Sequence, residues 1–255
     1  MKNTWRFNGN ESLYIRNVLE SGEGSATSGS VNNKFEQVFA KKIGADYGVT
    51  FNSGTSTLHA ALHAAGVGYG DEVIIPAPYY STYEEIAKIC GAKVIPIKTD
   101  TSSNFTFIFE DFEKALSDKT KLVVLVSPSN PTGTVLLKGL IDKVYDKLKM
   151  LDITLITDEI YEHYIYDDHK HYSLMSEHAE KENIISIYSL SKGYGLTGIR
   201  VGYIVSNKNT IATIAPFHHA MNICAPVNAQ YASIEALNLN REWFEVEMKN
   251  VIAAR

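Results

Sequence analysis

The sequence has few cysteines and no long apolar segment, so it lacks the features that mark disulfide-rich, membrane-spanning and secreted proteins. It contains two cysteines, Cys90 and Cys224, whose wide separation fits neither a disulfide framework nor a metal-binding spacing. This scarcity favours a reducing compartment. No segment has the apolar length of a membrane span, and the polar first residues lack the apolar core of a signal peptide. We therefore expect a cytoplasmic protein without a membrane partner.

Basic residues are also few and scattered. The 24 Lys and Arg residues are outnumbered by 29 Asp and Glu residues, which gives a net charge of −5. No basic run resembles a nucleic-acid footprint, so a nucleic-acid partner is not expected. With 255 residues, of which 45% are hydrophobic, the chain has the composition of a globular protein and can build one large domain or two smaller ones.

Apolar, β-rich segments alternate with helical patterns along most of the chain. Strands are expected at 47–52, 71–76, 93–97, 121–127, 153–157, 183–189 and 199–205. Several of these segments are apolar at consecutive positions, which is typical of strands covered by helices on both faces. The pattern predicts an α/β fold with three α/β/α layers and a mostly parallel sheet. Ligands of such sheets bind beyond the carboxyl ends of the strands.

The last fifty residues are helical in pattern, with helices expected at 208–221, 226–239 and 241–255. No cap, glycine or proline ends the last of them, which favours either a truncated end or a terminal helix that frays. We expect an N-terminal segment at 1–33 and a cofactor-binding large domain at 34–238. Residues 239–255 would begin a helix that leads to an absent or truncated small domain.

Polar clusters follow several of the predicted strands, and the first is NSGTST at 52–57. A strand ends and a helix begins there, so backbone N–H groups and the positive helix end can bind a phosphate. Ser53, Gly54, Thr55 and Ser56 are the candidate residues. The alternative is simple capping of the helix by Ser53 or Thr55.

The next two clusters are SPSNPTG at 127–133 and TDEIYEHY at 157–164. The first is a tight turn that presents the amide of Asn130, although a plain turn would look the same. In the second, Asp158 directly follows a buried strand and needs a cation, such as a protonated pyridine nitrogen. Tyr161 lies on the same side of the following helical turn. Taken alone, Asp158 would be read as an N-cap.

The fourth cluster is SLSKGYGLTGIRVGY at 189–203, which contains the most informative lysine of the chain. An ammonium is costly where a buried strand ends, but the amine of Lys192 is a good nucleophile toward a carbonyl compound such as pyridoxal phosphate (PLP). Arg200 can bind two oxygens of a phosphate, and Ser189 adds a hydroxyl. Four such clusters, in order and each at a strand end, predict one site.

Two histidine pairs lie outside these clusters. His169 and His171 could bind a metal, but the charges around them favour a solvated loop, so no metal site is predicted. His218 and His219 are adjacent on a helix and cannot share one face.

The motifs PAPYYSTYEE, SPSNPTG, TDEIY and SLSKGYGLTGIRVGY together carry a family resemblance. From about Pro76 onward the chain resembles the class I and II aminotransferases of PLP fold type I. Residues 14–77 are more similar to the sugar aminotransferases of the DegT/DnrJ/EryC1 group, which have the same fold type and a different lysine motif. The sequence therefore resembles a mosaic.

The resemblance to the class I and II enzymes implies roles for the candidate residues. Lys192 would form a Schiff base with PLP, Asp158 would pair with the pyridine nitrogen, and these two with Tyr161 would be catalytic. Tyr80 would stack on the cofactor ring. The cofactor-binding set is Ser53, Gly54, Thr55, Ser56, Tyr80, Asn130, Asp158, Tyr161, Ser189, Ser191, Lys192 and Arg200.

The same resemblance implies a homodimer that transfers an amino group between an amino acid and a 2-oxo acid. The alternatives are another PLP reaction on this fold, such as C–S lysis or decarboxylation, and a PLP-binding fragment or chimera without turnover. The arginine that binds the substrate carboxylate in class I enzymes lies farther downstream of the lysine than Arg255, so the residue with that role is not identified.

Overall fold

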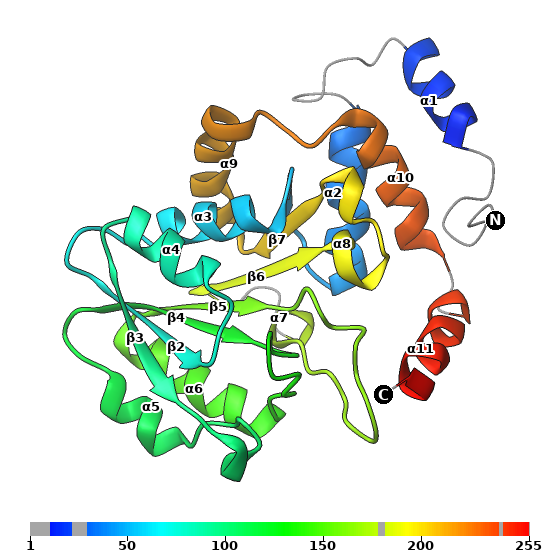
Figure 1. Ribbon diagram of the computed structural model, residues 1–255. Coiled ribbons are helices and arrows are strands. Elements are labelled where there is room, and N and C mark those ends of the chain that lie inside the picture. Colours follow the sequence, from blue (N-terminus) through cyan, green and yellow to red (C-terminus); the bar gives the residue numbers. More distant parts are fainter. Residues whose placement is uncertain (1–10, 22–29, 178–181, 240–241, 255) are drawn as a thin grey trace.

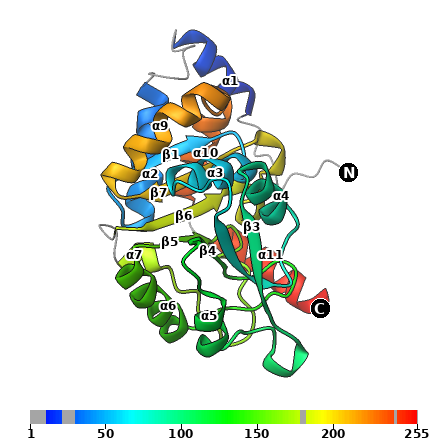
Figure 2. The same cartoon turned by 90° about the vertical axis from the view of Figure 1, so that its left-hand side faces the viewer.

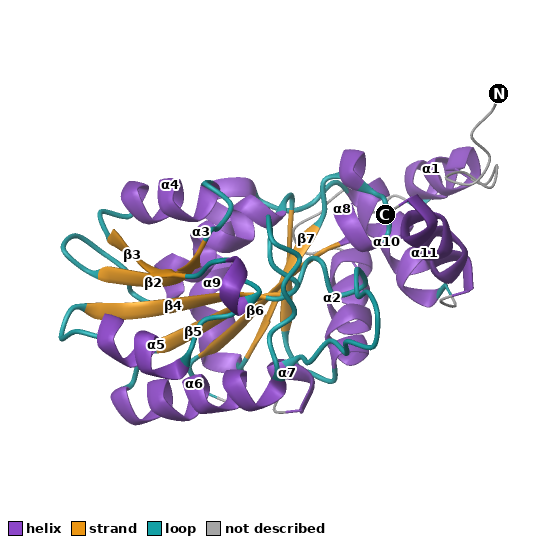
Figure 3. Ribbon diagram, turned by 60° about the horizontal axis from the view of Figure 1, so that its bottom comes forward, coloured by secondary structure: helices purple, strands orange, loops and turns teal. Residues whose placement is uncertain are grey.

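The computed structural model describes residues 11–21, 30–177, 182–239 and 242–254. Much of the expected N-terminal segment at 1–33 lies outside these residues. Within them, helices cover both faces of one sheet, as Figures 1 and 3 show. The expected three-layer α/β architecture is confirmed. No described helix has the length and apolarity required to cross a membrane.

One seven-stranded sheet forms the middle layer, in the order β1-β7-β6-β5-β4-β2-β3. The strands are β1 (Gly48–Phe51), β2 (Glu72–Ala77), β3 (Lys93–Lys98), β4 (Thr120–Val126), β5 (Thr154–Asp158), β6 (Ile184–Ser189) and β7 (Gly202–Ser206). β7 pairs antiparallel with β1 and β6, and every other pair is parallel. The expectation of a mostly parallel sheet is therefore confirmed.

Helices and short 3₁₀ segments (η) flank and connect the strands. They are α1 (Glu11–Glu20), α2 (Ser30–Ile43), α3 (Gly54–Ala64), α4 (Thr82–Ile89), η1 (Thr101–Ser103), α5 (Phe109–Ala115), α6 (Lys138–Leu151), α7 (Leu174–Glu177), α8 (Leu190–Gly193), η2 (Thr197–Ile199), α9 (Lys208–Asn222), α10 (Val227–Asn238) and α11 (Glu242–Ala254). Helix α1 lies at the end of the molecule opposite α5 and α6 (Figures 1 and 2).

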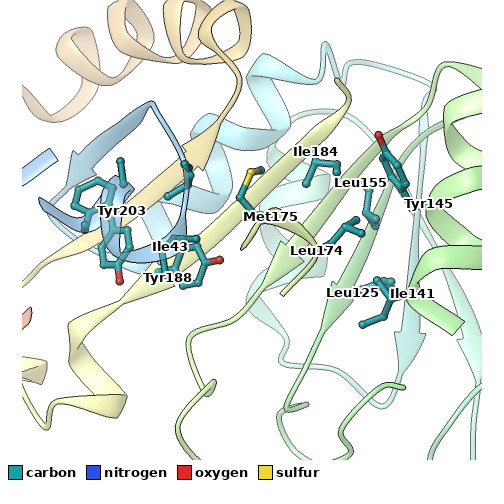
Figure 4. Packing of buried hydrophobic residues seen from close by; sticks show 14 of the residues in the cluster. Ile43, Leu125, Ile141, Tyr145, Leu155, Leu174, Met175, Ile184, Tyr188 and Tyr203 are labelled. Atoms are coloured by element: carbon teal, nitrogen blue, oxygen red, sulfur yellow. The ribbon is translucent and has the colours of Figure 1, made fainter. Parts of the chain in front are cut away.

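Consecutive apolar residues in the central strands divide between two cores. In β4, Leu122 and Val124 face a cluster built with α3, α4 and α9, whereas Val123 and Leu125 face a second cluster built with α2, α6 and α10. Figure 4 shows part of the second cluster, with Leu125 beside Ile141 of α6. Because both faces are covered, the strands read as continuous apolar runs rather than as alternating ones.

The end of the sheet near β7 differs from expectation in one respect. The strand begins at Gly202 rather than at residue 199, because Thr197–Ile199 form a 3₁₀ turn and Arg200 has a left-handed backbone with φ of 60°. This turn reverses the chain after α8, so that β7 returns between β6 and β1.

Candidate active site

The register of the sheet brings the predicted clusters to one edge. Asp158 pairs with Val126 of β4 and with Ile187 of β6, so β4, β5 and β6 end close together. Gly202, the first residue of β7, pairs with the last residue of β6, Ser189, and with the last residue of β1, Phe51. The four polar clusters follow β1, β4, β5 and β6, and they therefore lie at the same edge of the sheet.

Asp158 is a buried carboxylate with two neutral hydrogen-bond donors. Its side chain receives a hydrogen bond of 2.7 Å from the Tyr83 hydroxyl and one of 3.2 Å from the backbone N–H of Ile160. Burial raises the pKa of Asp158 from 3.8 to about 6, although both hydrogen bonds act in the opposite direction. A cation beside this carboxylate would relieve the cost of its burial.

Tyr83 is a neighbour of the candidate residue Asp158 that the sequence motifs do not single out. It lies three residues after Tyr80, on α4, and its ring forms an edge contact with that of Tyr80 at a centroid distance of 6.4 Å. Tyr83 is buried, whereas Tyr80 is half exposed and lies at the rim of the site. The only signal in the sequence is the i, i+3 spacing of the two tyrosines within PAPYYSTYEE.

Asn130, Tyr161 and Lys192 come together as predicted. The amide nitrogen of Asn130 donates to the Tyr161 hydroxyl at 3.4 Å, and the Lys192 ammonium lies 5.8 Å from the centroid of the Tyr161 ring. The pKa of Tyr161 is raised by burial and then by the nearby charges of Asp158 and Tyr80. Lys192 is exposed on α8, directly after β6 (Figure 1), so its amine is accessible from this edge.

The turn before α3 caps the helix through Ser53 and leaves the backbone at Gly54 accessible. The Ser53 hydroxyl accepts from the N–H of Ser56 at 3.1 Å, so Ser53 caps the helix. The Ser56 hydroxyl bonds back to Asn52 at 2.7 Å, and the Thr55 side chain is exposed. Apart from the chain neighbours of Gly54 and the backbone of its own helix, no heavy atom of the described residues lies within 4 Å of the position that a Cβ on Gly54 would take, so an anion can approach this helix end.

A second turn, between α8 and β7, packs against this helix end. A Cβ on Gly202 would lie 2.8 Å from the carbonyl carbon of Ser53, so the close approach requires glycine. The Ser189 hydroxyl accepts from the N–H of Ser191 at 3.1 Å and donates to the Val201 carbonyl at 3.0 Å. Ser189 pairs with Gly202 and therefore lies near the α3 turn, and Ser191 is hydrogen-bonded to Ser189.

The Arg200 side chain contacts its own turn rather than another candidate residue. Its guanidinium is exposed and donates at 3.1 Å to the carbonyl of Thr197, within its own turn. Its backbone lies two residues before Gly202, which is the residue that touches the α3 turn.

The expectation of a solvated loop holds for His169, which is exposed, and is wrong for His171. The His171 ring lies 2.9 Å from a carboxylate oxygen of Glu159, and 14% of its side chain is exposed. The physical reason is that Glu159 is 2% exposed, and a buried carboxylate requires donors. Sequence reasoning overlooked Glu159 because its neighbour Asp158 accounted for the motif.

Comparison with known proteins gives matches over most of the chain. The model of the family described as Aminotransferase class I and II matches residues 15–255. Aspartate aminotransferases of Pyrococcus abyssi and Pyrococcus horikoshii are 34% and 36% identical over 178 and 180 residues. These matches cover 70% of this chain in both cases, and 46% and 45% of the relatives. The chain thus spans about half the length of the curated relatives it matches.

Solved structures match over a larger share of the chain. An aromatic aminotransferase from Pyrococcus horikoshii OT3 superposes with a TM-score of 0.83 and 28% identity, over 93% of this chain and 66% of that one. The aspartate aminotransferase from Rhizobium meliloti gives a TM-score of 0.84 and 27% identity, over 94% and 62%. Because the family match begins at residue 15, it includes the front of the chain, and the predicted similarity of that part to sugar aminotransferases is not supported.

Proposed function

Because this chain belongs to the class I and II aminotransferases, we propose that it carries the PLP site of an enzyme that transfers an amino group between an amino acid and a 2-oxo acid. The observation that supports this most strongly is the buried carboxylate of Asp158 at the sheet edge that also carries Lys192. The homodimer and the cytoplasmic location expected from the sequence are part of the same proposal. So is the division into a large domain at 34–238 and a separate C-terminal segment at 239–255.

The residues at this edge fit PLP by their chemistry. Asp158 has a pKa raised to about 6, and among the described residues its side chain accepts from two neutral donors, so a protonated ring nitrogen would compensate its charge. The open backbone at Gly54, at the start of α3, suits a phosphate group. When bound, PLP supplies an aldehyde that amines attack and a ring that takes up electrons from the substrate α-carbon.

Lys192 and Asp158 have distinct tasks in this proposal. The amine of Lys192 would be the nucleophile that holds the cofactor, and the same amine would move a proton at the substrate α-carbon. The carboxylate of Asp158 would keep a proton on the ring nitrogen. Tyr83 fixes the orientation of that carboxylate through its hydrogen bond of 2.7 Å.

The remaining residues orient the cofactor. Asn130 and Tyr161, which already share a hydrogen bond, would bind the phenolic oxygen, and Tyr80 would stack on the ring from the rim. The turn at Ser53–Ser56 with Ser189 and Ser191 would hold the phosphate. Arg200 would exchange its bond to Thr197 for two phosphate oxygens.

The test is to find which lysine reacts with PLP. The protein is incubated with PLP, reduced with borohydride and digested, and peptide masses are measured; we expect the pyridoxyl mass on Lys192. Lys192→Ala should lose this adduct, whereas Lys208→Ala, a matched control in α9, should keep it. An adduct on Lys34 or Lys208 in the wild-type protein would refute the assignment. Incubation with a panel of amino acids, followed by identification of the 2-oxo acid products, then separates transamination from lysis and decarboxylation.

A further inference from the structure

A group of metal-ligating side chains lies next to the site but outside it. Glu159, Glu162 and His171 each offer one ligand atom, and these atoms lie within 4.8 Å of one another. All three belong to the loop between β5 and α7, with two residues at its start and one near its end. Among the described residues this is the one group of three or more such side chains that meets this distance.

The geometry of Glu159 and His171 suits a shared cation, with Glu162 close enough to reach it by a side-chain shift. One oxygen of Glu159 accepts from the hydroxyls of Thr157 at 2.9 Å and Ser173 at 3.2 Å, which fixes the carboxylate. The other oxygen lies 2.9 Å from Nε2 of His171. Two ligand atoms at this separation can share one cation through bonds of about 2.0–2.2 Å. Little movement of either side chain is therefore required.

The contact between Glu159 and His171 involves only one nitrogen of the imidazole, Nε2. Nδ1 of His171 is buried and has no hydrogen-bond partner among the described residues. Glu162 and His171 also line a cavity of about 380 Å³, which has room for water ligands. His163 lies on the same cavity, with its Nε2 3.8 Å from a Glu162 oxygen.

We propose that Glu159, Glu162 and His171 form a binding site for a divalent cation of the zinc class, completed by water from the cavity. Two carboxylates balance the charge of such an ion, and a mixed set of oxygen and imidazole ligands suits Zn²⁺ better than Mg²⁺ or Ca²⁺. The bound ion would join the start and the end of the loop that carries Tyr161. This site does not depend on the function proposed above.

The experiment is a titration of the chelator-treated full chain with Zn²⁺ alone, followed by calorimetry and by thermal unfolding. We expect one saturable site per chain and a rise in Tm with Zn²⁺. Glu162→Gln should weaken binding at least tenfold and remove the rise in Tm, because the amide keeps the volume but loses the charge. This position is chosen because its side chain is 23% exposed, against 3% for Glu159. His169→Asn, an exposed histidine on the same loop, is the matched control and should bind as the wild type does.

Three results would overturn the site: no saturable binding of Zn²⁺ by the wild type, equal affinity of Glu162→Gln, or loss of binding in His169→Asn. If Glu162→Gln does not fold, His171→Gln makes the same comparison. Parallel titrations with Mg²⁺ and Mn²⁺ test the class of cation, and tighter binding of Mg²⁺ than of Zn²⁺ would contradict it. PLP is absent from every arm, so a failure to bind Zn²⁺ leaves the lysine assignment untouched.

Discussion

Tyr83→Phe isolates the hydroxyl that touches the central carboxylate. The ring stays in place, while Asp158 loses its donor at 2.7 Å and keeps only the N–H of Ile160 at 3.2 Å. A hydrogen bond to a charged group contributes about 1.5–3 kcal/mol. The acid dissociation constant of Asp158 should therefore fall about 10- to 100-fold, because 1.4 kcal/mol is a factor of about ten.

The sign of the effect on stability follows from the direction of the pKa shift. The folded-state pKa of Asp158, about 6, lies above its ordinary value of 3.8, so ionisation of Asp158 destabilises the cofactor-free fold as pH rises through about 6. Without the Tyr83 hydroxyl the ionised state is less well compensated. We expect Tyr83→Phe to lower the free energy of unfolding by about 1.5–3 kcal/mol at pH 8, and by about 1 kcal/mol at pH 5, where the acid is protonated.

The assay is urea unfolding of the cofactor-free wild type and variant at pH 5 and at pH 8. Tyr79→Phe is a matched control, because its hydroxyl donates at 3.2 Å to Glu84 at the surface, and it should show little change at either pH. A loss of stability in Tyr83→Phe that is equal at both pH values would show that the hydroxyl serves packing alone. A larger loss at pH 5 would mean that the Tyr83 hydroxyl stabilises the protonated acid, and would contradict the assignment that this hydrogen bond lowers the pKa of Asp158.

Two further predictions concern Arg200, the proposed phosphate ligand, and His218, a buried histidine of α9. Arg200→Ala should release PLP faster on dialysis, because the phosphate loses a bidentate partner; equal retention would mean that Arg200 only holds its turn. His218, buried against Phe51, has its pKa lowered from 6.5 to about 4 by burial, so its contribution to stability is present above pH 6.5 and is lost as pH falls toward 4. His218→Phe should remove a pH-dependent loss of up to about 3 kcal/mol, measured by urea unfolding at pH 7 and pH 4.5, and an unchanged difference between these pH values would contradict this.

The sequence predicted the three layers of the fold and the edge of the sheet at which the polar clusters meet, because both depend on local patterns. Apolar runs mark strands covered on both faces, and every predicted strand is present with bounds shifted by a few residues at most. The meeting of Asn130, Tyr161 and Lys192 followed from their positions after successive strands of one sheet. Motifs at strand ends converge once the strands pair, so their spacing along the chain does not matter.

The sequence did not reveal contacts that depend on which side chain a distant helix turns inward. Tyr83 and Asp158 are 75 positions apart, and no periodicity connects them. His171 looked solvated because charged residues surround it, yet the burial of Glu159 determines its environment. In both cases a buried carboxylate, Asp158 or Glu159, requires a hydrogen-bond donor nearby. The sequence alone does not show that these carboxylates are buried.

The position of Asp158 connects the fold of this chain to its proposed chemistry. A carboxylate surrounded by neutral donors at the end of a central strand weakens the cofactor-free fold above pH 6, as its raised pKa implies. A ligand that brings a cationic nitrogen to this carboxylate relieves the cost, so part of its binding free energy comes from strain already present in the protein. An uncharged ring would leave the burial cost of the ionised carboxylate in place. In the proposed site the carboxylate would therefore favour a protonated nitrogen, and the Tyr83 hydroxyl would reduce the cost of keeping the carboxylate ionised without supplying a positive charge.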